Sequence, residues 1–236
     1  MDALLQIEDL SKHYGMVNAL ENISLSLPAG RIVGLLGPNG SGKTTLIKLI
    51  AGLMTPSSGT ILIDGKPIGP ETKAIVSYLP DRIYFNENQR VSDLILLYKD
   101  FYDDFDEQTA QTILDDLNIN IKKKFNTLSK GTKEKVQLAL VMSRRAKLYL
   151  LDEPIAGVDP AARDYILTTI ISNYHRDATI LISTHLISDV EQVLDDYLFL
   201  HNGHIIQQGS AKEQKEATGQ TLDELFREVF RCLPNC

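Results

Sequence analysis

A glycine-rich loop is the part of this sequence whose residue types most clearly suggest chemistry. The loop consists of Gly37, Pro38, Asn39, Gly40, Ser41, Gly42, Lys43 and Thr44. Glycines let backbone N–H groups turn inward toward phosphate oxygens, and a following helix points the positive end of its dipole at the same anion. Lys43 can reach the β- and γ-phosphates, and the Thr44 hydroxyl can ligate Mg²⁺. The pattern predicts a nucleotide-phosphate site, with a ligand-free glycine loop as the alternative.

A second chemical element is a pair of carboxylates at the end of an apolar run. Leu148 to Leu151 is followed directly by Asp152 and Glu153. Ligands of α/β folds bind at the carboxyl ends of strands, so both side chains are suitably placed. Asp152 is suited to hold the Mg²⁺ shell, and Glu153 can polarise an attacking water. Alone, this pattern is more often a plain strand end, but together with the glycine loop it indicates nucleotide hydrolysis.

The composition indicates a globular chain with one sizeable core. The chain has 236 residues, of which 43% are hydrophobic, and a net charge of −7. That charge argues against a nucleic-acid-binding surface, because phosphate backbones require clustered Lys and Arg. Lys122 to Lys124 forms a candidate basic patch, and we expect it to be a solvated loop.

Cysteine usage and hydropathy indicate the compartment. The two cysteines, Cys232 and Cys236, lack the partners of a zinc site, so we expect reduced thiols in a cytosolic protein. The start of the chain lacks the basic and long apolar segments of a signal peptide. No run approaches 18 apolar residues, so we expect no membrane span and assign any membrane role to a partner.

The elements before residue 82 are predicted to be strands around one helix. Asn22 to Leu27 alternates strictly and fits a half-buried antiparallel strand. Ile32 to Leu36 is an apolar run that leads into the glycine loop, and Lys43 to Ala51 follows as a helix. Ile61 to Ile63 followed by Asp64-Gly65 predicts a hairpin.

The rest of the chain alternates helical and strand patterns. Residues 82–147 are expected to be mostly helical, with Ala110, Ile113, Leu114 and Leu117 on one helix face. Leu148 to Leu151 and Thr179 to Ile182 fit buried parallel strands, with a helix start at Asp159-Pro160 between them. Asn202-Gly203 predicts a hairpin, and Thr221 with Glu224 predicts a capping box.

These motifs together resemble those of the ABC ATPases, over essentially the whole chain. The segment Leu128-Ser129-Lys130-Gly131-Thr132 is similar to the signature motif of that family, with Lys130 and Thr132 where Gly and Gln are usual. The resemblance implies that Ser129 and Gly131 contact the γ-phosphate of ATP held by an opposite subunit. Read alone, this segment predicts only a capped helix start.

Further positions take their roles from the same resemblance. It places the glycine loop and Thr45 on the nucleotide, Tyr14 on the adenine ring, and His185 at the γ-phosphate as a switch histidine. It places Asp159, within Ala156-Gly157-Val158-Asp159, on a loop that crosses the dimer interface. The alternatives are packing for Tyr14, a structural role for His185 and a helix cap for Asp159.

One position departs from the family pattern. A Gln usually follows the strand after the hairpin, but here Val76 to Pro80 leads to Asp81. An acidic residue here, with Lys130 in the signature, resembles the ABC-2-type branch, which contains exporters of peptides, antibiotics and polymers. We expect Asp81 to contribute to the metal site, with capping of the turn after Pro80 as the alternative.

The resemblance implies a fold and a set of partners. We expect an α/β P-loop NTPase with a RecA-like parallel-sheet core, an antiparallel β subdomain and an α-helical signature subdomain. Residues 1–236 would form a single ABC ATPase domain, with the helical subdomain at about 82–147 and a C-terminal helix at about 218–231.

The implied cofactors are ATP and Mg²⁺. The implied partners are a second ATPase subunit, identical or paralogous, in a head-to-tail dimer and an integral membrane transporter subunit. The chain would then lie on the cytoplasmic face of the membrane and drive export. Rival hypotheses are a soluble ABC ATPase acting on ribosomes or DNA, and a regulatory subunit without turnover.

Overall fold

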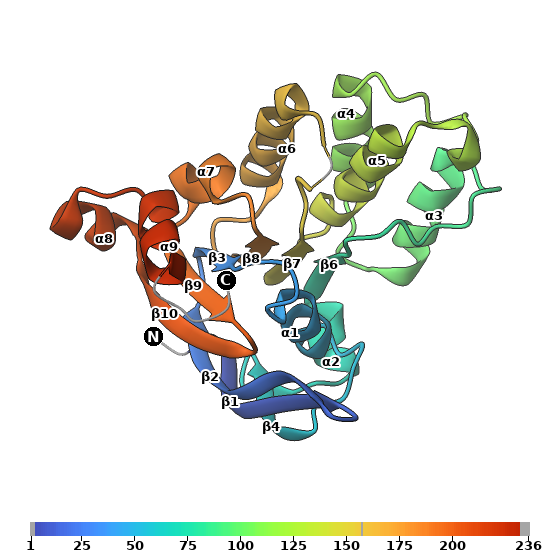
Figure 1. Ribbon diagram of the computed structural model, residues 1–236. Helices are drawn as coiled ribbons and strands as arrows, with labels where there is room; N and C mark the ends of the chain where they lie inside the picture. The colour runs from blue at the N-terminus through green and yellow to red at the C-terminus, as the bar shows by residue number, and fades with distance from the viewer. Residues whose placement is uncertain (1–2, 157, 232–236) are drawn as a thin grey trace.

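The central layer of the protein is a six-stranded sheet with the order β10-β9-β3-β8-β7-β6. The computed structural model describes residues 3–156 and 158–231 (Figure 1). The strands are β3 (Ile32–Leu36), β6 (Val76–Leu79), β7 (Leu148–Asp152), β8 (Thr179–Thr184), β9 (Asp196–His201) and β10 (His204–Ser210). Neighbouring strands from β9 to β6 are parallel, whereas β10 is antiparallel to β9. The predicted parallel strands at Leu148 and Thr179 are confirmed, and they are direct neighbours.

A second sheet of four antiparallel strands has the order β2-β1-β4-β5. Its strands are β1 (Ala3–Tyr14), β2 (Val17–Pro28), β4 (Ser58–Ile63) and β5 (Lys66–Pro67). The predicted hairpin turn is confirmed, since Asp64 and Gly65 both have positive φ and connect β4 to β5. Asn202 and Gly203 have the same left-handed backbone between β9 and β10.

Two hydrophobic cores lie on opposite faces of the central sheet. On one face, α1 (Lys43–Ile50) packs together with the four-stranded sheet, and Leu46 and Ile47 are fully buried there with Val33 and Leu35. The other face carries the remaining large core, to which Leu36 and Leu151 belong. Side chains of a strand alternate between faces, so the central strands are apolar on both sides. This double coverage explains their continuous apolar runs.

The segment between β6 and β7 is mainly helical. It contains α3 (Val91–Phe101), α4 (Glu107–Asp116), the 3₁₀ turn η1 (Phe125–Thr127) and α5 (Lys130–Met142). Ala110, Ile113 and Leu114 are buried on one face of α4, as their spacing predicts. Residues 80–90 are irregular, so the first helix begins at Val91 and not at residue 82. Lys122 to Lys124 are exposed, as expected of a solvated loop.

Further helices complete the fold. They are α2 (Pro70–Ala74), α6 (Pro160–Asn173), α7 (Ile187–Val190), the 3₁₀ turn η2 (Glu191–Val193), α8 (Ala211–Thr218) and α9 (Leu222–Arg231). The predicted capping box is present at the start of α9, where Thr221 N–H donates to Glu224 and Glu224 N–H donates to Thr221. Phe226 and Phe230 of α9 stack on each other and contact Phe199 of β9 edge-on. Helix α9 thus covers the end of the sheet near β9 (Figure 1).

Cys232 and Cys236 lie outside the described residues. Within the described ranges, no helix combines the length and hydropathy that a bilayer crossing requires. The division of residues 1–236 into one domain with a helical and a C-terminal part stays a prediction.

Candidate functional site

The glycine loop lies between the carboxyl end of β3 and the start of α1, as its sequence position predicts. Gly42 is the N-cap of α1 with φ 110°, and Gly40 has φ 81°. A Cβ atom at Gly42 would lie 2.7 Å from the Ala19 carbonyl, so this position requires glycine both for backbone angle and for space. The loop can therefore present backbone N–H groups at the helix N-terminus, where anions bind.

Lys43 is held over this loop. Its side chain is 5% exposed, and Nζ donates to the carbonyl oxygens of Gly37, at 2.8 Å, and Pro38, at 3.2 Å. Nζ also forms an ion pair with Glu153 Oε1 at 3.3 Å. A buried ammonium needs partners, and here the loop and the carboxylate supply them. The cation is positioned for phosphate by contacts that a phosphate could replace.

Asp152 joins β7 to the loop helix and to β8. Its Oδ1 accepts hydrogen bonds from the Thr44 hydroxyl at 3.1 Å and from the Ser183 hydroxyl at 2.6 Å. Its Oδ2 is buried and has no hydrogen-bond partner among the described residues. Burial raises the pKa of Asp152; the two hydroxyl donors oppose that shift, while the charges of Asp81 and Glu153 add to it. A cation next to Oδ2 would supply the missing partner.

Glu153 is strained and connects two functional side chains. It has φ 52°, which is unfavourable for a residue with a Cβ atom. Its N–H donates to the backbone oxygen of Ser183 at 3.0 Å, which helps to hold this conformation. The carboxylate contacts Lys43, and its Oε2 lies 3.0 Å from His185 Nδ1. Lys43, Asp152, Glu153 and His185 were predicted separately, and the structure brings them to one place.

Asp81 lies two residues after the end of β6, which is the neighbour of β7 in the sheet. Its carboxylate is 3.8 Å from the Arg82 guanidinium, and its charge contributes to the raised pKa of Asp152. Asp81 is therefore electrostatically within reach of the site. Within the described ranges, no group of three or more His, Cys, Asp or Glu side chains could hold a metal ion by itself.

The signature residues lie at the start of α5. Ser129 is the N-cap, and its hydroxyl accepts the Thr132 N–H at 3.2 Å, so the capped helix start that the segment alone predicts is present. Ser129 and Gly131 are both exposed. In the described part of the chain, no hydrogen bond or ion pair joins either residue to Lys43 or Glu153, which leaves their polar groups accessible to a second molecule.

The remaining predicted residues also lie at the surface. Tyr14 ends β1 with 44% of its side chain exposed, and its hydroxyl donates to the Met54 sulfur at 3.0 Å. Thr45 is half-buried in the first turn of α1, and Asp159 is exposed just before α6. Gly157 of the same predicted loop lies outside the described residues. Lys12 Nζ lies over the Tyr14 ring at 5.3 Å from its centroid, so the other face is the one available for stacking on a ligand.

Two polar residues that support the site were missed by sequence reasoning. Ser183 binds Asp152 and the backbone of Glu153, and a signal existed, since a hydroxyl at the end of a buried strand is suited to bridge to its neighbour. Gln137 of α5 is 3% exposed and donates to the carbonyl oxygens on both sides of Asp81. Only the interruption of an apolar stretch by a glutamine indicated that this residue needs partners.

Known proteins with similar sequences and structures fit this geometry. A family model described as "ABC transporter" matches residues 20–156. The ABC transporter ATP-binding protein YtrB of Bacillus subtilis is 33% identical over 216 residues, which cover 90% of this chain and 74% of that protein. The SkfA peptide export ATP-binding protein SkfE of Bacillus subtilis is 31% identical over 236 residues, 98% of this chain and 97% of that protein.

A solved structure of an ATP-binding subunit of an ABC transporter superimposes with a TM-score of 0.87. It is 32% identical in sequence, and the match covers 96% of this chain and 99% of the other. The matched family region begins within β2, includes the glycine loop and α5, and ends just after the two carboxylates of β7. With its phosphate loop, strand-end carboxylates and exposed signature residues, the chain belongs to the ABC transporter family, as one of its ATP-hydrolysing ATP-binding subunits.

Proposed function

We propose that this ATPase works as a head-to-tail pair and drives export through a separate membrane subunit. The main observation in support of this proposal is the cluster of Lys43, Asp152, Glu153 and His185 around the phosphate loop. A regulatory subunit without turnover would not need a carboxylate held in a strained backbone between a lysine and a histidine. Export as the direction is supported by the similarity to SkfE, which is named as a peptide export ATP-binding protein.

Each side chain has a role in this proposal. Lys43 exchanges its loop carbonyls and Glu153 for the phosphates of ATP, which the N–H groups of the glycine loop also bind. Glu153 accepts a proton from the attacking water, while His185 Nδ1 orients the Glu153 carboxylate. Tyr14 offers an exposed ring face to the adenine.

The residues at hand also fit Mg²⁺. The buried Oδ2 of Asp152 lacks a partner, and the Thr44 hydroxyl lies next to the same carboxylate. Oxygen ligands of this kind suit a hard cation that keeps several waters, and Mg²⁺ would neutralise charge on the phosphates. Asp81 adds a second carboxylate nearby, which strengthens the local preference for a cation.

The head-to-tail pair would complete the site from the other subunit. Ser129 and Gly131 are exposed at the N-terminus of α5, where a hydroxyl and a glycine can face the γ-phosphate on the opposite copy. Asp159 is exposed before α6 and would lie at the same interface. Two copies with a net charge of −7 each repel one another, so nucleotide is needed to hold them together.

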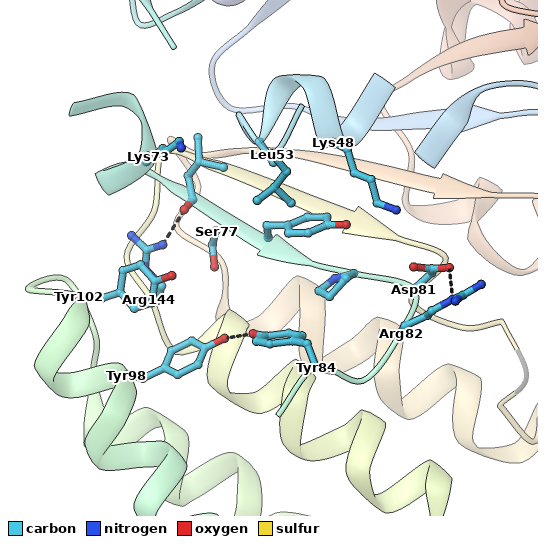
Figure 2. Close-up of a pocket in the computed structure, with 14 residues that line it drawn as sticks. Lys48, Leu53, Lys73, Ser77, Asp81, Arg82, Tyr84, Tyr98, Tyr102 and Arg144 are labelled. Atoms are coloured by element: carbon cyan, nitrogen blue, oxygen red, sulfur yellow. Dashed lines mark hydrogen bonds and ion pairs between the residues drawn. The ribbon is translucent and has the colours of Figure 1, made fainter. Parts of the chain in front are cut away.

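A groove beside Asp81 is our candidate for the membrane partner. It has a volume of about 510 Å³ and lies between α1, β6 and the helical segment (Figure 2). Tyr84, Tyr98 and Tyr102 form one wall; the hydroxyls of Tyr84 and Tyr98 are 2.5 Å apart. The buried Arg144 supports that wall by a cation–π contact to Tyr102 at 3.8 Å and an ion pair with Asp104. The wall is thus rigid and aromatic, as suits a docking surface.

The charge of this groove indicates what docks there. Lys48 and Lys73 line it, and among the described residues their Nζ atoms form no ion pair or hydrogen bond. Arg82 lies 3.8 Å from Asp81 and offsets its charge, so Lys48 and Lys73 leave the groove cationic although the chain is acidic. A cytoplasmic segment of the membrane subunit that carries carboxylates would complement it.

Two measurements test the proposal. Purified chain should hydrolyse ATP in a steady-state assay, and it should co-purify with the membrane protein encoded beside it. Replacing Lys48 and Lys73 by Glu should release that protein while ATP binding by the isolated chain persists. Co-purification with ribosomes or DNA in place of a membrane protein would instead support the rival soluble machine.

A further inference from the structure

The backbone of the turn that carries Asp81 receives its hydrogen bonds from one side chain in the described part of the chain. The amide nitrogen of Gln137 donates to the carbonyl oxygens of Pro80, at 3.3 Å, and Arg82, at 3.4 Å. Within residues 3–156 and 158–231, no other hydrogen bond reaches the backbone of residues 80–85. Pro80 has no N–H to donate, and the segment is irregular. Phe85 anchors the end of the segment in the core, and Gln137 supplies the hydrogen bonds that fix Pro80 and Arg82 on either side of Asp81.

Gln137 is a buried polar residue. It is 3% exposed in the third turn of α5, among apolar neighbours in the same helix. Burying an amide is unfavourable unless it is hydrogen-bonded, and among the described residues the partners of the Gln137 amide nitrogen are the two carbonyls of the turn. Its Oε1 atom is buried and has no partner among the described residues. A methionine or leucine would pack here without that cost, so the amide has a purpose other than packing.

The Asp81 turn lies between the groove described above and a second, small cavity. Pro80, Asp81 and Arg82 line the 510 Å³ groove on one side. The same three residues, with Gln137 and Glu153, line a separate cavity of about 30 Å³. That cavity is large enough for one water molecule. A shift of the turn would thus change the shape of both the groove and the cavity beside the Glu153 carboxylate.

We infer that Gln137 is a positioning residue that fixes the Asp81 turn to α5 and so sets where Asp81 stands relative to the nucleotide site. Helix α5 begins at the signature cap Ser129, which lies two turns before Gln137. Movement of α5 when the signature engages a partner would carry the turn with it through these two hydrogen bonds. The inference rests on the proposed role of Asp81 only where Mg²⁺ is concerned.

The test variant is Gln137→Met, which keeps the side-chain volume and removes both donors. Arg82 offers a direct readout, because trypsin cleaves at its carbonyl and its side chain is 90% exposed. We expect cleavage between Arg82 and Ile83, followed by mass spectrometry on the full chain, to become about tenfold faster. Ser143→Ala is the matched control, since Ser143 is also buried at the end of α5 but donates only within its own helix, to Ala139.

Catalysis gives the second readout. Gln137→Met should lower kcat about tenfold while KM for ATP stays within about twofold. The reason is that the turn positions the reacting groups but does not bind the adenine and is not part of the phosphate loop. Gln137→Met should raise the Mg²⁺ concentration that is needed for half-maximal activity. In the Asp81→Asn variant, adding Gln137→Met should cause no further rise.

Three outcomes would overturn the inference: unchanged cleavage at Arg82, equal acceleration in Ser143→Ala, or an additive Mg²⁺ shift in the double variant. The cleavage assay contains no nucleotide, so its result stands even if the proposed transport function or the metal role of Asp81 fails. Gln137→Glu keeps the length of the side chain and replaces the donor by an oxygen. It serves the same test if the methionine variant does not accumulate as folded protein.

Discussion

The Nζ atom of Lys43 lies 3.3 Å from Oε1 of Glu153, so the lysine of the phosphate loop and the carboxylate at the end of β7 form an ion pair. Both side chains are largely buried, at 5% and 14% exposure. We expect a γ-phosphate that binds Lys43 to replace this carboxylate. The displaced Glu153 would keep its contact with His185 and become available to a water molecule. Binding and preparation of the base are thus linked through one contact.

Replacing Lys43 by Ala should largely abolish nucleotide affinity. The substitution removes a charge-assisted contact to the phosphates, which is worth about 2–3 kcal/mol or more. Calorimetric titration with ATP measures the loss. Lys66→Ala is the control, because in the described structure Lys66 pairs with the exposed Glu71 and not with the phosphate loop. The ATP affinity of this control variant should match that of the wild type. If Lys43→Ala binds ATP with wild-type affinity, the assignment of this loop to phosphate binding is wrong.

Replacing Glu153 by Gln should separate binding from chemistry. The amide keeps the shape but cannot accept the proton, so turnover should fall by roughly 10² or more. It also competes less well for Lys43 than a carboxylate does, so ATP affinity should be retained or increase. The variant should accumulate as an ATP-bound dimer in size-exclusion chromatography. A monomeric profile at saturating ATP and Mg²⁺, together with full activity, contradicts this expectation.

Replacing Ser129 by Arg should block the ATP site of the opposite subunit only. The monomer should still bind ATP, because the Ser129 side chain makes no contact with the phosphate loop in the described structure. Loss of the cap on Thr132 costs about 1 kcal/mol of stability in both Ser129→Arg and the control Ser129→Ala. Only the arginine adds bulk at the interface. Dimerisation of Ser129→Arg with ATP, seen by light scattering, would show that the signature assignment fails.

The contrast between local and distant contacts explains which parts of this structure could be predicted. Residue types and spacing were enough for the phosphate loop, for β7 with its carboxylates, and for the turn at Asn202, since each depends on neighbours in the chain. Asp152 and Ser183 are 31 positions apart and meet only because β7 and β8 are adjacent. The bond from Gln137 to Pro80 spans 57 positions. Contacts of this kind need the topology, which one sequence does not contain.

Replacing Asp152 by Asn should stabilise the nucleotide-free protein. Burial raises the pKa of Asp152, so ionising it costs more in the folded than in the unfolded state. That cost is absent well below the ordinary Asp pKa of about 4, where Asp152 is protonated in both states, and is fully present above its raised native pKa. The stability gain of Asp152→Asn should therefore grow as pH rises toward neutrality. Chemical denaturation at several pH values measures it.

The same variant should lose stabilisation by metal. Mg²⁺ with ATP should raise the unfolding temperature of the wild type, because the cation offsets the buried charge of Asp152. Asp152→Asn should show little of this increase, although ATP alone still binds. Asp104→Asn would be an unsuitable control, since it breaks the pair with the buried Arg144. Asp177→Asn is suitable, because Asp177 is an exposed residue in the turn between α6 and β8.

Replacing Asp81 by Asn tests the departure of this chain from the usual glutamine. A carboxylate binds Mg²⁺ better than an amide does, but without metal it repels the γ-phosphate. The two effects oppose each other, and the Mg²⁺ concentration decides which is larger. Asp81→Asn should therefore raise the Mg²⁺ concentration needed for half-maximal ATPase activity. Metal-free ATP binding should be little weakened or even improved.

The alternative role for Asp81 is purely local. If Asp81 only caps the turn after Pro80, removal of its charge leaves the metal site intact. In this structure its carboxylate faces Arg82 at 3.8 Å, yet its charge is also felt at Asp152, which favours the metal role. An ATPase titration against Mg²⁺ at fixed ATP distinguishes the two, with Asp64→Asn as a control that breaks only the exposed pair with Lys147. Superimposable wild-type and Asp81→Asn curves would leave the local role as the better explanation, because a ligand cannot be neutralised without a change in metal dependence.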